Sequence, residues 1–171
     1  MSDRTDNQPS AIDDLVLHAE AYAQTFTSGD LPRIPTKGLA VVTCMDGRIN
    51  LAALLGLGEG DAHMIRNAGG VIGEGELRSL AVSQRLLGTT EIVVILHTDC
   101  GMRTFKDEEF RDQLEAETGV RPDWTPVAFG DVADDVRANV QRVLDDPFLP
   151  HKKSVRGFIY DVKTGQLSEV V

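Results

Sequence analysis

The chain has 171 residues, of which 42% are apolar and 26% charged, the composition of an ordinary globular protein of one domain. Its 27 acidic and 17 basic side chains give a net charge of −10, which argues against a nucleic-acid or anionic-membrane partner. The polar start of the chain lacks the apolar stretch of a secretion signal, and residues 92–96, the longest strongly apolar run, are too few to cross a bilayer. We therefore expect a cytoplasmic protein.

An N-terminal arm and helix are expected over residues 1–35. Residues 1–9 have the composition of a disordered lead-in, and Ser10 followed by Asp13 has the pattern of a capping box. Apolar side chains then recur at helical spacing, which predicts an amphipathic helix over 11–25. The Gly- and Pro-containing segment that follows ends this helix.

Residues 36–171 have the pattern of a single α/β domain. Short β-branched apolar runs, typical of strands buried on both faces, alternate with segments of helical periodicity. The predicted strands are 38–43, 62–66, 91–97, 155–162 and 167–171, and the predicted helices are 49–55, 76–87, 104–118 and 131–145. Such an alternation favours a mainly parallel sheet with helices on both sides.

Both cysteines of the chain stand where a predicted strand ends. Cys44 opens the motif CMDGR directly after strand 38–43, and Cys100 belongs to the motif HTDCG at the end of strand 91–97. Because open α/β sheets bind ligands beyond the C-terminal ends of their strands, the two motifs are expected to meet. Two thiolates and an imidazole are ligands that zinc prefers, so Cys44, His97 and Cys100 are predicted to hold Zn²⁺.

A carboxylate and a guanidinium follow the first of these cysteines. Asp46 is close enough in sequence to Cys44 to reach the metal, and Arg48 can hold that carboxylate away through a bidentate pair. The fourth metal position is thus left either to water, which makes the site catalytic, or to Asp46, which closes it. Arg66 is interpreted as a structural ion-pair partner, and Asp99 as a cap for local backbone groups.

Three motifs resemble those of the β-class carbonic anhydrases in order and approximate spacing. They are Cys-x-Asp-x-Arg at 44–48, Arg66-Asn-Ala-Gly69 and His97-x-x-Cys-Gly101. The likeness covers residues 36–171 and is greatest for the short bacterial members. It implies one α/β/α domain around about four parallel strands plus an antiparallel edge strand. It also implies a homodimer or homotetramer in which the N-terminal helix embraces a neighbour.

The same resemblance implies an enzyme that reversibly hydrates carbon dioxide to bicarbonate and a proton on Zn²⁺. Asp46 and Arg48 would be its catalytic pair, with Asp46 as the fourth zinc ligand in a closed state. The residues expected to contact the substrate are Asn67, Ala68, Gly69 and Gly101. Residues 67–70 also fit a simpler interpretation, an ordinary turn after a strand.

Two other functions keep the same zinc site. One is a hydrolase of carbon disulfide or carbonyl sulfide. Gly47 and Met102 stand where other residues are common in the family, and these differences concern the preferred substrate more than the metal. The other is a non-catalytic zinc-binding homologue, which the presence of both Asp46 and Arg48 disfavours. A phosphatase-like cysteine is also disfavoured, because three residues between Cys44 and Arg48 cannot wrap a phosphate.

Overall fold

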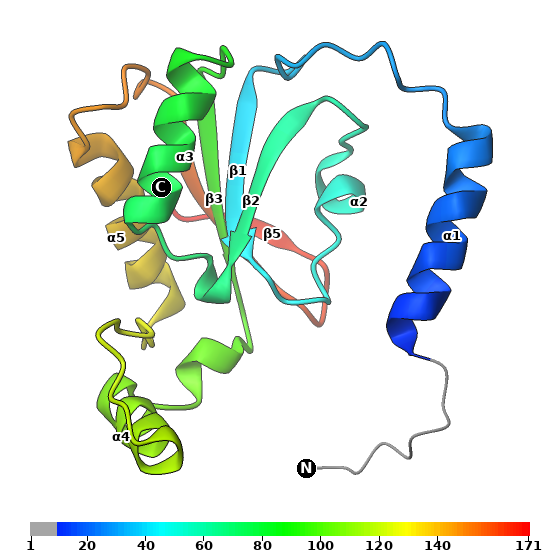
Figure 1. Cartoon of the computed structure of the whole chain (residues 1–171). Coiled ribbons are helices and arrows are strands. Elements are labelled where there is room, and N and C mark those ends of the chain that lie inside the picture. The colour runs from blue at the N-terminus through cyan, green and yellow to red at the C-terminus, as the bar shows by residue number, and fades with distance from the viewer. Residues whose placement is uncertain (1–9) are drawn as a thin grey trace. The chain divides into compact units, whose positions relative to one another are not determined.

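The computed structural model of the chain describes residues 10–171, so the predicted lead-in over residues 1–9 lies outside the described residues. The chain divides into two compact units, with the boundary between Leu31 and Pro32. The first unit contains helix α1 (Ala11–Thr25), and the second contains the sheet and all other helices (Figure 1). Among the described residues, no helix is both long and apolar enough for a membrane span.

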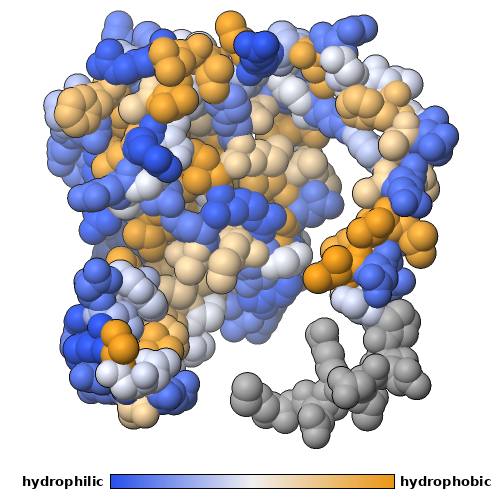
Figure 2. Space-filling model, in the orientation of Figure 1, coloured by the Kyte–Doolittle hydropathy of each residue, from blue (hydrophilic) through white to orange (hydrophobic). Residues whose placement is uncertain are grey.

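Helix α1 begins at the capping box that its sequence predicts. The Ser10 amide donates to Asp13 Oδ2 over 3.2 Å, and the Ile12 amide donates to Ser10 Oγ over 3.2 Å. None of its side chains is buried in the described chain. Leu15 and Val16 are among its exposed apolar residues, and Figure 2 shows apolar side chains gathered on this helix. Helix α1 therefore forms without a core of its own.

The second unit is built on a five-stranded sheet in the order β2-β1-β3-β4-β5. The strands are β1 (Leu39–Cys44), β2 (Ala62–Asn67), β3 (Glu91–His97), β4 (Val155–Tyr160) and β5 (Leu167–Glu169). Strands β2, β1, β3 and β4 are parallel, and β5 pairs antiparallel with β4. This confirms the predicted fold of a mainly parallel sheet with an antiparallel edge strand.

Helices cover both faces of this sheet (Figure 1). They are α2 (Leu51–Leu55), α3 (Glu74–Arg85) and α5 (Val132–Asp145). Helix α4 (Asp107–Thr118) lies beyond the ends of the strands, and two short 3₁₀ turns, η1 (Ala68–Gly70) and η2 (Gly101–Arg103), complete the unit. Alternate residues of a strand face opposite sides, so Val42 packs with Leu80 of α3 and Val140 of α5, while Val41 packs with Leu51 of α2. The central strands are thus buried on both faces, as their apolar runs predict.

The structure corrects several predicted boundaries: α2 begins at Leu51 and not at 49, α3 ends at Arg85 and not at 87, and β5 ends at Glu169 and not at 171. Helix α3 begins two residues before the predicted start at 76, because the amide of Gly73, its N-cap, is satisfied by Glu76 Oε2 at 3.0 Å. Helix α4 begins at Asp107 instead of 104, after the η2 turn. Strand β4 ends at Tyr160 and not at 162, because Asp161 Oδ1 accepts hydrogen bonds from the next turn.

Candidate metal centre

The sheet brings the two cysteine motifs to one edge. Cys44 is the last residue of β1 and His97 the last of β3, and these neighbouring parallel strands end at the same side. Cys100 follows in the turn after β3. Its Sγ lies 3.9 Å from Cys44 Sγ, and one ligand atom from each of the three residues lies within 4.8 Å of the other two. All three side chains are buried.

The orientation of the His97 ring leaves one nitrogen available to a cation. Its Nδ1 donates a hydrogen bond to the Thr98 carbonyl oxygen at 2.9 Å, which leaves the lone pair on Nε2. That Nε2 is buried and has no hydrogen-bond partner. Tetrahedral zinc, with bonds of about 2.3 Å to sulfur, holds two thiolates about 3.8 Å apart, close to the sulfur separation here. The donor set therefore fits Zn²⁺.

The two thiols differ in acidity. Burial opposes ionisation of Cys44, but the nearby His97 ring and the backbone N–H groups of Asp46 and Gly69 lower its pKa to about 7. Burial raises the pKa of Cys100 to about 11, and the adjacent Cys44 adds to that rise. Burial, helped by the adjacent Cys44, thus favours a protonated Cys100, and a bound cation would favour the ionised form of both thiols.

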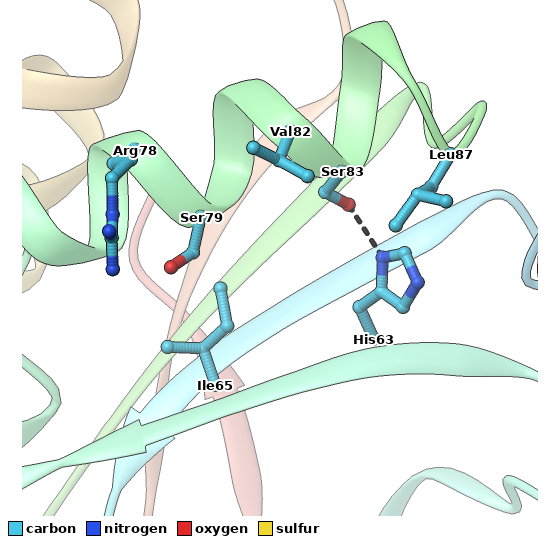
Figure 3. A pocket seen from close by; sticks show the side chains of 7 residues that line it. All are labelled: His63, Ile65, Arg78, Ser79, Val82, Ser83 and Leu87. Carbon is cyan, nitrogen blue, oxygen red and sulfur yellow. Dashed lines mark hydrogen bonds between the residues drawn. The ribbon is translucent and has the colours of Figure 1, made fainter.

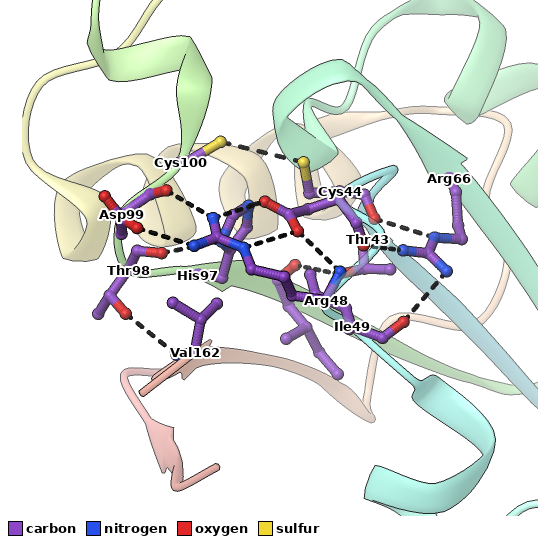
Figure 4. Close-up of polar contacts among 12 residues, drawn as sticks. Thr43, Cys44, Arg48, Ile49, Arg66, His97, Thr98, Asp99, Cys100 and Val162 are labelled. Carbon is purple, nitrogen blue, oxygen red and sulfur yellow. Dashed lines mark hydrogen bonds and ion pairs between the residues drawn. The ribbon is translucent and has the colours of Figure 1, made fainter. Parts of the chain in front are cut away.

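Asp46 and Arg48 form a bidentate ion pair beside this cluster (Figure 4). Arg48 Nε donates to Asp46 Oδ1 at 3.0 Å and Nη2 donates to Oδ2 at 2.7 Å. The amide of Arg48 also donates to Oδ1, at 2.9 Å. These hydrogen bonds hold the pKa of Asp46 well below its usual range. Asp46 Oδ2 lies 3.8 Å from His97 Nε2, so an ionised carboxylate faces the cluster.

Asp99 is a second carboxylate on the same guanidinium. Arg48 Nη1 donates to Asp99 Oδ2 at 2.8 Å, and Nη2 donates to the Asp99 main-chain oxygen, also at 2.8 Å. Arg48 lowers the pKa of Asp99 as well. The expected role of Asp99 as a cap for local backbone groups is therefore wrong, since its side chain reaches across to the loop after β1.

Arg66 organises the backbone of that loop. Its guanidinium donates to the carbonyl oxygens of Cys44, Ile49 and Asp46, over 3.0, 3.2 and 2.6 Å (Figure 4). The interpretation of Arg66 as an ion-pair partner is thus corrected, because its described contacts are to main-chain carbonyls. One planar side chain on β2 thus fixes the end of β1 at Cys44 and the loop that carries Asp46 and Arg48.

A small cavity of about 190 Å³ opens onto the cluster. Its lining residues are Cys44, Met45, Asp46, Ala68, Gly69, Cys100, Gly101 and Met102. The expected substrate contacts Ala68, Gly69 and Gly101 thus line it. Asn67 instead closes the turn after β2, because its side chain exchanges two hydrogen bonds with the backbone of Val71. The sequence did not indicate that Met45 and Met102 would supply an apolar wall.

Gly70 lies directly against the strand that ends in Cys44. A Cβ at this position would lie 2.9 Å from the Cys44 amide nitrogen, and the φ of 69° also favours glycine. The turn after β2 therefore both contributes to the cavity wall and packs onto β1.

A larger cavity of about 340 Å³ lies between β2 and α3 (Figure 3). His63 Nδ1 and Ser83 Oγ lie 2.7 Å apart there, and Ser83 Oγ also lies 2.7 Å from Thr89 Oγ1. The described residues that line it include neither a cysteine nor a carboxylate. The residues that line this cavity therefore do not suit a zinc ion as well as the cysteine cluster does.

Comparison with known proteins agrees with this geometry. The family model described as carbonic anhydrase matches residues 39–167. Beta-carbonic anhydrase 1 of Mycobacterium tuberculosis is 48% identical over 161 residues, covering 94% of this chain and 98% of the relative. A carbon disulfide hydrolase of an Acidianus strain is 31% identical and covers 91% and 87%. The crystal structure of a carbonic anhydrase from Streptococcus mutans superposes with a TM-score of 0.90, at 40% identity, covering 96% and 99%.

Proposed function

This chain belongs to the β-carbonic anhydrase family, and from that premise we propose that it is a zinc enzyme that reversibly hydrates carbon dioxide to bicarbonate and a proton. One observation carries the proposal. The Nε2 atom of His97 is buried and has no hydrogen-bond partner, and it lies close to the sulfurs of Cys44 and Cys100. The three atoms lie beside the ionised Asp46 carboxylate, at the mouth of a small cavity with apolar walls.

We assign the zinc to Cys44 Sγ, His97 Nε2 and Cys100 Sγ. Bound there, zinc would supply Lewis-acid chemistry, lowering the pKa of a water molecule enough for it to attack carbon dioxide near neutral pH. The hydrogen bond from His97 Nδ1 to the Thr98 carbonyl supports the assignment, because such a contact fixes the ring and makes Nε2 a better donor of electrons.

Asp46 is assigned the task of orienting the attacking water. Its carboxylate stays ionised near neutral pH because Arg48 lowers its pKa, so it accepts a hydrogen bond and does not donate one. Arg48 holds both oxygens of the Asp46 carboxylate and limits the rotation of that carboxylate toward the metal. Release from Arg48 would let Asp46 become a fourth ligand and close the site. Asp46 and Arg48 are therefore the proposed catalytic pair.

The cavity suits a small apolar substrate. Met45 and Met102 supply its apolar wall, while Ala68, Gly69 and Gly101 add no polar side chain to it. Carbon dioxide is linear, apolar and small enough for such a space. Carbon disulfide and carbonyl sulfide share these properties, and relatives of lower identity are named carbon disulfide hydrolases. The higher identity to a carbonic anhydrase favours carbon dioxide.

We further propose a homodimer or homotetramer in the cytoplasm. The exposed apolar side chains of α1, none of them buried in the described chain, support a contact with a second copy. Cys44 and Cys100 are the two cysteines of the chain, and their assignment to zinc leaves none for a disulfide, as is usual for proteins of a reducing compartment. The net charge of −10 supports the expectation that neither nucleic acid nor a membrane is a partner.

Stopped-flow hydration of carbon dioxide by the zinc-loaded protein tests the activity. Hydration well above the buffer rate is expected, and parallel assays with carbon disulfide and carbonyl sulfide should give lower kcat/KM. A higher kcat/KM for either sulfur compound would move the assignment to a hydrolase. Full zinc content without activity on any of the three would instead indicate a non-catalytic zinc protein.

A further inference from the structure

The turn between His97 and Cys100 contains a residue in a strained conformation. Asp99 has a φ of 55°, and among the described non-glycine residues only Asp99 and Val127 have a positive φ. Glycine adopts this region without a steric penalty, and aspartate tolerates it better than most other residues. A carboxylate in this position therefore carries a conformational cost that glycine would avoid, which points to a use for its side chain.

That side chain holds the outer end of the Arg48 guanidinium. Arg48 Nη1 donates to Asp99 Oδ2 at 2.8 Å, while Nε and Nη2 of the same guanidinium hold Asp46. The Asp46 side chain is 16% exposed, that of Asp99 is 65% exposed, and Arg48 lies between them at 47%. The three residues form a chain from solvent to the metal cluster.

The chain also joins the two loops of the site. Arg48 and Asp46 belong to the loop after β1, whereas Asp99 belongs to the turn after β3, between two of the proposed zinc ligands. Without the Asp99 carboxylate, Arg48 would keep one contact to that turn, the main-chain oxygen of residue 99. The Arg48 guanidinium and the Asp46 carboxylate that is hydrogen-bonded to it would then be freer to move together.

We propose that Asp99 is a positioning residue for the hydration reaction, fixing Arg48 to the turn that carries His97 and Cys100 and so setting where the Asp46 carboxylate stands. The inference rests on the proposed function. Asp99 acts through Arg48 and does not line the cavity.

Two substitutions separate this role from a structural one. Asp99→Gly removes the carboxylate and relieves the strain, whereas Asp99→Asn keeps an oxygen acceptor and tolerance of the backbone angle. We expect Asp99→Gly to lower kcat/KM by about threefold to tenfold, and Asp99→Asn by less. The melting temperature should stay within about 4 °C of wild type, because strain relief offsets the lost ion pair. Zinc per chain should stay unchanged.

A matched control removes a similar exposed ion pair far from the site. Arg156 pairs with Glu169 at 2.6 Å, and Glu169→Gln should leave kcat/KM at the wild-type value. The decisive comparison repeats Asp99→Gly in an Arg48→Ala background, where it should change kcat/KM by less than about twofold. Three results would each overturn the proposal. They are an undiminished effect of Asp99→Gly in the Arg48→Ala background, a wild-type kcat/KM for Asp99→Gly alone, and a loss of kcat/KM that follows zinc content. A wild-type protein without hydration activity would instead overturn the proposed function itself.

Discussion

The sulfur atoms of Cys44 and Cys100 lie 3.9 Å apart although 56 positions separate the two residues in the sequence. Adjacent parallel strands produce this contact, since β1 delivers one cysteine and the turn after β3 the other. The lone pair of His97 Nε2 is aimed into the same space and meets no protein donor. These three atoms form a preorganised group that suits a metal ion.

Arg48 and Asp46 should each be needed for hydration and not for zinc binding. Arg48→Ala should keep zinc yet lower hydration by roughly tenfold to a hundredfold, because the freed carboxylate can bind the metal. Asp46→Ala should also keep zinc and lose activity, but with the fourth position open. The measurement is the hydration rate between pH 6 and 9 with zinc content on each sample. A wild-type rate for Arg48→Ala across that range would reduce the pair to a structural ion pair.

Gly70→Ala should destabilise the protein by about 1–3 kcal/mol, because the new methyl group would meet the Cys44 amide nitrogen at 2.9 Å. Gly75→Ala is the matched control, since a Cβ there meets nothing within 4 Å and the residue lies in helix α3. Urea unfolding of the metal-free proteins gives both values. Equal stability of the two variants would show that the turn at Gly70 can move away from β1.

The N-cap of helix α5 should contribute a pH-dependent part of the stability. Backbone N–H groups of Asp134 and Ala133 donate to Asp131 and lower its pKa. A lowered folded-state pKa means that the stabilisation is complete above the unfolded value, about 3.9, and is lost as the pH falls through the folded value. Asp131→Asn keeps a capping oxygen without the charge. Its stability deficit, measured by urea unfolding from pH 7 to 3, should shrink below about pH 4. A deficit that does not change with pH would contradict this account.

Helix α1 should take part in self-association. Wild type should have at least twice the chain mass of 18.6 kDa by light scattering at micromolar concentration. The double substitution Leu15→Glu with Val16→Glu places two charges among the exposed apolar side chains of α1. It should lower that mass, because burying a charge without a partner is unfavourable. Ala21→Glu, about 140° around the helix from Val16, is the control. A wild-type mass of one chain would contradict the proposed assembly.

Local sequence patterns were sufficient for the sheet and for the grouping of Cys44, His97 and Cys100. β-Branched runs identify β1 and β3, and chain order places Cys44 and His97 at their ends. The partners of Arg66 could not be predicted, because they are main-chain carbonyls 17 to 22 positions away that meet it only in the folded sheet. The Arg48–Asp99 pair was likewise hidden, since it spans 51 positions and depends on a left-handed φ that no neighbouring residue signals.

The central claim is that Cys44, His97 and Cys100 hold the zinc on which hydration depends. Its most direct test is to strip the metal with a chelator, return zinc stepwise and measure carbon dioxide hydration and bound zinc on the same samples. We predict that activity rises linearly with bound zinc up to about one zinc per chain and does not rise further. Cys44→Ala should bind little zinc and stay inactive, while the neighbouring control Met45→Ala should bind zinc like wild type. Full zinc binding by Cys44→Ala, or hydration by the metal-free protein at the wild-type rate, would contradict the account.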